Sequence, residues 1–289
     1  MVSKQLKLKT FWMIKFFAGC MVFMLLSMAS IAQRLEYGIN LFSTSYLGEL
    51  NNSTTFLTNV RYGGGLHIRK FLTPWWTIRG DANWARIAGS DNLANPGTTA
   101  ILRNLSFRSD ILDFDFLTEF HFREIGNRRN DYKMTPYIFG GVNLYRFNPK
   151  AEIAGTWTEL KPLSTEGQGF LEYPDKVPYA LTQIGIPLGF GLRWAMSQKW
   201  RFAFEASYRY TFNDYLDDVS GTYVNPAVLS ANRGNLAVLL ADRGRELSNA
   251  ISPAADGDVR GAPRNNDAYV FVGITFSYVV YRKTCPRWR

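Results

Sequence analysis

The sequence predicts an all-β fold: an eight-stranded antiparallel transmembrane β-barrel with long extracellular loops and short periplasmic turns. Three observations in the 289-residue chain support this prediction. Apolar and polar residues alternate with period two in many segments, as in strands with two different environments. The connections between these segments are alternately long and short, as in bacterial outer-membrane barrels. After residue 32 no run of 18 apolar residues predicts a membrane-spanning helix.

The clearest strand covers residues 199–212. Aromatic residues such as Phe202 and Tyr208 occupy one parity, and charged residues such as Glu205 and Arg209 occupy the other. A soluble sheet would bury the aromatic face, whereas a membrane barrel turns it to lipid and keeps the charges in the lumen. This segment alone is compatible with both, so the choice depends on the other strands.

Similar segments give eight expected strands. They cover residues 33–43, 60–71, 75–87, 108–122, 135–147, 179–194, 199–212 and 268–281. Both faces of the fifth strand are apolar, so its orientation stays unassigned. The connections run to roughly 16, 4, 20, 11, 31, 5 and 53 residues, which puts the long loops at one end. The last loop contains leucines at helical spacing over residues 236–247, which predicts a short helix.

The N-terminus reads as a secretory signal peptide. Four lysines precede or enter an apolar run over residues 16–28, and Ser30-Ile31-Ala32 resembles a cleavage site. An uncleaved anchor helix is the alternative. We therefore expect a signal peptide (1–32), a barrel (33–282) and a basic periplasmic tail (283–289), with Sec-type export to the outer membrane of a double-membraned bacterium. Only Cys285 would survive processing, so no intrachain disulfide is possible.

Charge is concentrated at the end with the short turns. The formal charge is +9, the leader lysines account for four, and the processed chain carries +5. The expected periplasmic turns and tail sum to +8, so the remainder is acidic. Such a basic rim favours an acidic periplasmic partner, although simple anchoring at the membrane interface explains it equally well. The candidate contacts are Arg128, Arg129, Lys133, Lys283 and Arg287. The modest positive net charge of the processed chain does not indicate nucleic-acid binding.

The inward face predicts a polar core in the lumen. An eight-stranded barrel is just wide enough for its interior side chains to fill, so mixed charges inside should pair. The residues chosen for this core are Arg79, Asp81, Asp113, Asp115, Glu119, Arg201, Glu205 and Arg209. A structural role is favoured over a proton path or a catalytic cluster.

We predict no catalytic, cofactor or metal residues. The chain has only two histidines, His67 and His121, and an acyl hydrolase would need a Ser or Cys nucleophile beside a base. Asp214, Asp217 and Asp218 follow the seventh strand. They could bind calcium through oxygen ligands, but we favour the interpretation that they are solvent-exposed residues at the start of the loop.

Several segments in order resemble one protein family. They are residues 45–50 (SYLGEL), 103–110 (RNLSFRSD), 135–141 (TPYIFGG), 147–151 (FNPKA), 163–169 (LSTEGQG) and 215–220 (YLDDVS). Together they are similar to the PorG-type outer-membrane barrels of Bacteroidota, a DUF6089-like family, over nearly the whole processed chain.

The resemblance implies a non-enzymatic component of the type IX protein secretion system. It also implies contact with a periplasmic lipoprotein ring, written PorK and PorN, and it provides no catalytic residues. Two alternatives remain: an outer-membrane lipid-modifying enzyme, and a surface adhesin or receptor that acts through the loops over 148–178 and 213–266.

Overall fold

The computed structural model describes residues 34–51, 59–95, 98–125, 133–247, 254–261 and 266–281. The expected signal peptide and basic tail lie outside these residues. The wall strands are β1 (Arg34–Leu47), β2 (Arg61–Phe71), β3 (Trp76–Ser90), β4 (Ser106–His121), β5 (Met134–Arg146), β8 (Thr182–Ala195), β9 (Trp200–Thr211) and β10 (Ala268–Tyr281).

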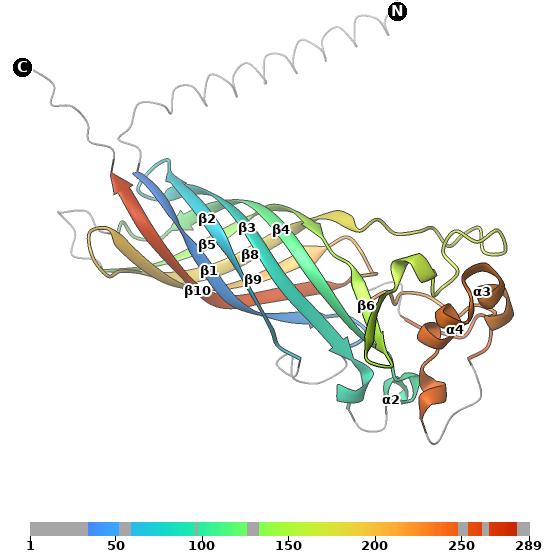
Figure 1. The fold of residues 1–289 in the computed structure, drawn as a ribbon. Helices are drawn as coiled ribbons and strands as arrows, with labels where there is room; N and C mark the ends of the chain where they lie inside the picture. The colour runs from blue at the N-terminus through green and yellow to red at the C-terminus, as the bar shows by residue number, and fades with distance from the viewer. Residues whose placement is uncertain are drawn as a thin grey trace, which may run out of the picture.

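These eight strands form a closed antiparallel barrel, which confirms the predicted fold class. Each strand pairs with its neighbour in the chain, β1 pairs with β10, and the pairing of β3 with β4 closes the remaining edge. Closure leaves no wall strand with unpaired edges. β1 begins and β10 ends at one end of the barrel, which we call the turn end (Figure 1). The long connections gather at the opposite end, which we call the outer mouth.

The outer face of the wall is apolar and exposed, the reverse of a soluble protein. Leu66 is 64% exposed, Phe116 61% and Ile184 63%. The predicted outward face of β9 is confirmed, because Phe204 and Tyr208 are 43% and 42% exposed. Aromatic side chains also cluster near the turn end, where the Trp76 and Phe120 rings lie 5.0 Å apart. An apolar belt with aromatic edges is the surface that a lipid bilayer requires of a barrel.

The structure settles the orientation of β5. Tyr137, Phe139 and Tyr145 point inward, although they are aromatic. Their rings lie over the inward glycines of the neighbouring strand β8. A Cβ at Gly191 would be 2.5 Å from the Tyr137 ring, and one at Gly189 would be 2.4 Å from the Phe139 ring. The glycines of β8 therefore provide the space that the aromatic side chains of β5 fill.

The outer mouth carries ordered elements that the sequence predicts only in part. They are η2 (Asp91–Leu93), α2 (Thr99–Arg103), β6 (Pro149–Ile153), β7 (Thr156–Glu159), η3 (Lys161–Leu163), α3 (Pro226–Arg233), α4 (Asn235–Ala241) and η4 (Gly244–Glu246). The predicted helix over 236–247 ends at Ala241 and is preceded by α3 (Figure 1). α3 begins where the Asn225 side chain accepts a hydrogen bond from Ala227 N and Pro226 opens the first turn.

The stretch 148–178 was predicted to be a plain loop, but the structure shows that part of it forms strands. β6 continues the line of β5 and pairs with β4 through Arg108 and Lys150, and it then folds back on β7. A proline lacks the N–H that a strand donates to its neighbour, so Pro149 suggests the end of a strand in the sequence. In the structure Pro149 occupies the first position of β6, where a missing N–H is tolerated. None of the helices in the described part of the chain has the length and apolar character to cross a membrane.

Candidate functional site: a sealed lumen and a closed outer mouth

A network of buried ion pairs fills the middle of the lumen. Arg69 donates to Glu119 at 2.8 Å and to Glu205 at 2.7 Å. Arg79 donates to Asp81 at 2.7 Å and to both oxygens of Glu205 at 2.8 Å. Glu119 and Glu205 each bind both arginines, which come from β2 and β3, whereas Asp81 binds Arg79 of its own strand. An arginine without its carboxylate would be costly at this depth.

A second layer of charges lies nearer the outer mouth. Arg209 donates to Asp113 at 2.7 Å and to Asp115 at 2.6 and 3.0 Å. Asn143 and Tyr269 also donate to Asp113. The cavity left between the two layers measures about 30 Å³. A water molecule needs roughly 10–15 Å³ of such space, so this cavity holds very few waters.

All eight residues chosen from the sequence for the lumen core point into the lumen. Seven are at most 7% exposed, and the side chain of Glu205 is 12% exposed. Arg201 lies at the turn end, where its Nη1 donates to the carbonyl oxygens of Ser197 and Trp200. Arg61, whose position in the alternation also suggests an inward side chain, is exposed at the outer mouth instead.

The histidines lie inside the wall. His67 Nδ1 is 2.6 Å from Asn40 Oδ1, and His67 Nε2 is 2.8 Å from Ser277 Oγ. Arg69 can only donate, so its approach to His67 Nε2 at 2.9 Å makes that nitrogen the acceptor. The result is a Ser–His–Asn arrangement with the geometry of an activated nucleophile. Ser277 and His67 are 1% and 4% exposed, so no substrate reaches them in this structure.

The second histidine also has a structural environment. His121 Nε2 lies 3.1 Å from Thr77 Oγ1 and 3.3 Å from Glu119 Oε2. Its ring stacks on Phe71 with the centroids 5.6 Å apart. These contacts place it at the turn end of the lumen, and it is 1% exposed.

A folded segment closes the outer mouth. Residues 213–221, which we call the mouth segment, turn back over the barrel directly after β9. Leu216 and Val219 are 0% and 1% exposed and pack into an apolar cluster on the wall strands. The other buried members of the cluster are Tyr46, Leu50, Ala85, Ile87, Leu105, Phe107, Ile111, Tyr145, Phe147, Tyr179, Tyr269 and Phe271.

Glu166 holds the mouth segment against the 148–178 connection. Its carboxylate accepts hydrogen bonds from Ser220 N and Gly221 N, both at 3.0 Å, and from Arg260 at 3.0 Å. Asp218, which is 0% exposed, accepts from Thr165 at 2.5 Å and from Tyr179 at 2.7 Å. Burial raises the pKa of Asp218 to about 6. The mouth segment is therefore fastened by side chains from the connection before β8 and by Arg260 of its own connection.

The interpretation that Asp214, Asp217 and Asp218 are solvent-exposed at the start of the loop is wrong. All three are buried, at 8%, 1% and 0% exposure. Asp217 and Asp267 share the hydroxyl of Tyr46, whose oxygen lies 2.7 and 2.6 Å from their carboxylate oxygens. Burial and the neighbouring carboxylates raise the pKa of Asp217 and of Asp267 well above the ordinary value. A Cβ at Gly48 would be 2.0 Å from Asp267 Oδ1, so glycine allows β1 to end against this group.

The basic residues chosen as partner contacts fall mostly outside the described part of the chain. Arg128, Arg129, Lys283 and Arg287 are not described, and Lys133 is exposed at the turn end. Three further cations of the described turns, Lys70, Arg123 and Lys199, are also exposed there.

The sequence did not reveal that five of the six segments carrying the family resemblance meet at the outer mouth, whereas residues 135–141 lie in β5 near the turn end. Tyr46 comes from the first of them, Arg103 and Leu105 from the second, and Phe147 from the fourth. Thr165 and Glu166 then bond to the mouth segment. Each segment alone resembles an ordinary loop, because its partners are distant in the chain.

The geometry defines a class: a closed eight-stranded β-barrel with a lipid-compatible outer face, a filled lumen and a sealed outer mouth. The family model described as a domain of unknown function, DUF6089, matches residues 15–237. The chain belongs to that family.

Solved structures of bacterial barrels are similar to this chain at low identity. The attachment invasion locus protein Ail of Yersinia pestis has 9% identity and a TM-score of 0.39, over 86% of this chain and 100% of that one. Neisserial surface protein A has 9% identity and a TM-score of 0.41, over 84% and 96%. OprG from Pseudomonas aeruginosa has 10% identity and a TM-score of 0.38, over 86% and 96%. No curated protein sequence matches the chain significantly.

Proposed function

We propose that this protein is a non-enzymatic, non-conducting barrel of the bacterial outer membrane that acts through its two ends. The observation that carries the proposal is the lumen, where interlocked ion pairs leave a cavity of only about 30 Å³. A barrel that transports or transforms a small molecule needs space for it. A filled barrel offers instead a rigid membrane anchor with surfaces at the two ends.

The proposed orientation puts the turn end in the periplasm and the mouth segment outside. Short periplasmic turns and long outer loops are the usual arrangement of bacterial barrels. Export would use the expected signal peptide. The apolar outer face supports insertion in lipid, because such a surface would be a severe aggregation liability in water.

The finer proposal is a role in type IX protein secretion. The resemblance of the segments given above to PorG-type proteins supports contact with a periplasmic lipoprotein ring. The contacts we propose are Arg128, Arg129, Lys133, Lys283 and Arg287. A cluster of cations at the turn end would steer an acidic partner surface toward the membrane.

Two experiments test this role. A deletion strain should fail to release cargo that carries the type IX C-terminal signal, and normal release would remove the secretion proposal. Reversing the five proposed contact charges should release the periplasmic partner in a pull-down. The matched control reverses Arg61 and Arg233, which lie at the outer mouth, and should keep the partner. Loss of partner in both variants, or in neither, would remove the proposed contact surface.

A surface receptor is the second candidate, because the outer connections form a folded layer. α3, α4 and the 148–178 connection share an apolar cluster that includes Phe170, Leu229 and Ala237. Leu171 on this layer is 96% exposed. A receptor role predicts that trimming 223–247 abolishes ligand binding and leaves secretion intact.

A further inference from the structure

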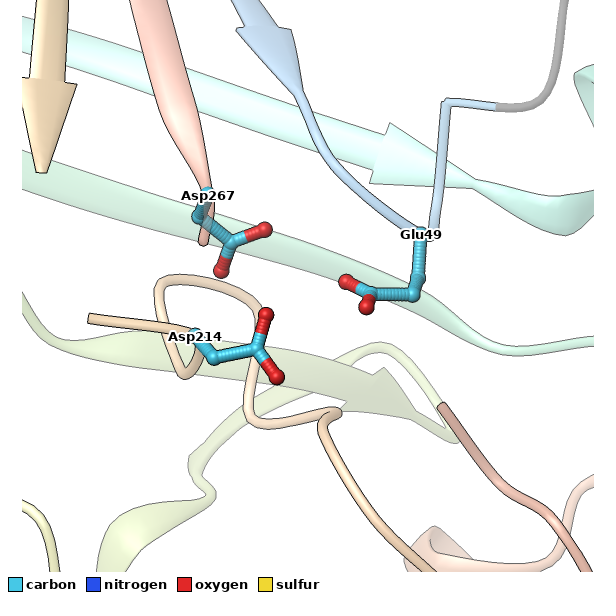
Figure 2. Close-up of side chains that lie close together, drawn as sticks. All are labelled: Glu49, Asp214 and Asp267. Atoms are coloured by element: carbon cyan, nitrogen blue, oxygen red, sulfur yellow. The ribbon is translucent and has the colours of Figure 1, made fainter. Parts of the chain in front are cut away.

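Four carboxylates converge at the outer mouth. Glu49 follows β1, Asp214 and Asp217 belong to the mouth segment, and Asp267 precedes β10. One oxygen from each of Glu49, Asp214 and Asp267 lies within 4.8 Å of the other two. Figure 2 shows the three carboxylates pointing toward a common centre from separate connections. Asp217 joins the group through the hydroxyl of Tyr46.

Three of the four carboxylates, those of Asp214, Asp217 and Asp267, take part in no ion pair among the described residues. The guanidinium whose charge acts on Asp217 belongs to Arg103, and Asp91 already binds it at 2.7 and 2.8 Å. Burying carboxylates together without a counter-charge is unfavourable.

The contacts of Tyr46 require that either a further proton or a cation is bound in this group. The phenol oxygen lies 2.7 Å from Asp217 and 2.6 Å from Asp267, but a phenol has one proton to donate. One of these two contacts therefore joins two oxygens with no proton between them, unless a further proton or a cation is bound. Both contacts are buried, so water cannot screen the repulsion.

Asp214 provides an independent sign of a ligand. The residue is 8% exposed, and its Oδ2 accepts a hydrogen bond from Ser220 Oγ at 2.6 Å. Its Oδ1 is buried and accepts no hydrogen bond. Buried carboxylate oxygens are nearly always satisfied, so one without a donor at the centre of an acidic group is the position of a metal ligand.

We propose that Glu49, Asp214 and Asp267 bind a divalent cation, Ca²⁺, at the outer mouth. Ca²⁺ takes oxygen ligands at 2.3–2.6 Å, so ligands on opposite sides of one ion lie about 5 Å apart. The three oxygens lie within 4.8 Å of one another, which is inside that limit. Mg²⁺ holds its ligands at 2.0–2.1 Å in stricter geometry and is usually bound by one or two carboxylates, so a group of three favours Ca²⁺.

The bound ion would tie three connections of the barrel together. Glu49 belongs to the β1–β2 connection, Asp214 to the mouth segment and Asp267 to the strand entry of β10. The ion would therefore fix the closed mouth from outside, where Ca²⁺ is available. This inference does not depend on a role in secretion.

The test is Tb³⁺ luminescence of the full chain folded in detergent. Tb³⁺ replaces Ca²⁺ and is excited through a nearby tyrosine, here Tyr46. We expect saturable luminescence that Ca²⁺ displaces at lower concentration than Mg²⁺. Asp214→Asn keeps the acceptor for Ser220 but removes the charge, and it should weaken Tb³⁺ binding at least tenfold. Glu172→Gln removes an exposed outer carboxylate and should leave binding unchanged.

Folding of each variant is checked by its heat-dependent electrophoretic migration. If Asp214→Asn does not fold, Glu49→Gln decides, because Glu49 is only half-buried and its replacement should weaken binding in the same way. Calcium should also raise the Tm of the wild type and not that of the variant. Absence of saturable binding in the wild type, or equal binding by wild type and variant, would overturn the site. Equal displacement by Mg²⁺ would overturn the assignment to Ca²⁺.

Discussion

Replacing Arg209 with methionine tests whether the lumen charges are a buried network. Arg209 is 4% exposed and donates three hydrogen bonds of 2.6–3.0 Å to Asp113 and Asp115. Arg209→Met would leave two carboxylates in the lumen without their counter-charge. Breaking a buried pair in this way costs about 3–5 kcal/mol. That loss reduces the equilibrium constant for folding by at least about a hundredfold, since each 1.4 kcal/mol is tenfold.

The matched control is Arg86→Met. Arg86 also binds a carboxylate, Asp110, at 2.6 Å, but the two side chains are 34% and 37% exposed. An exposed pair contributes about 0–1 kcal/mol, so this variant should be nearly as stable as the wild type. The assay is reversible urea unfolding in lipid vesicles, followed by tryptophan fluorescence. Equal losses in the two variants would refute the view that the lumen is a desolvated ion-pair network.

Three further predictions concern the interior and the mouth. Gly191→Ala should destabilise the barrel by about 1–3 kcal/mol, because its Cβ would be 2.5 Å from the Tyr137 ring. In the control Gly80→Ala, the added Cβ meets nothing closer than 3.8 Å, so this variant should be tolerated. Equal urea midpoints for the two variants would contradict this prediction. Burial raises the pKa of Asp218 from 3.8 to about 6, so without divalent cations its contribution to stability is full below pH 4 and is lost as the pH rises through 6. Hydrogen-exchange protection of 213–221 should then be higher at pH 5 than at pH 8, and the reverse order would refute it. Ser277 should not react with a fluorophosphonate probe in the folded protein, because it is 1% exposed; labelling that Ser277→Ala abolishes would restore the lipid-enzyme alternative.

The strands were predictable because alternation is a local property of the chain. The faces of β9 follow directly from its period of two, and the same holds for Glu36 and Asn40 in β1. The faces of β5 did not follow, because Tyr137 and Phe139 are apolar on a face where other strands carry charges. Their environment depends on the glycines of β8, about fifty residues further along the chain.

The contacts at the outer mouth could not be predicted from the sequence for a related reason. Asp217 and Asp218 look like solvated loop residues until the fold brings Tyr46, Thr165 and Tyr179 to them. The same is true of Ser277, which meets His67 only because β10 and β2 both flank β1 in the closed barrel. Contacts of this kind are set by closure of the sheet, which no local pattern encodes.

Electrical recording from the purified protein in planar lipid bilayers tests the central claim most directly. Ion pairs fill the middle of the lumen, and the folded mouth segment covers its outer end. We therefore expect insertion of folded protein with no stable conductance steps across a wide range of voltage. Reproducible single-channel steps from the folded wild-type protein would show that the lumen is an open pore.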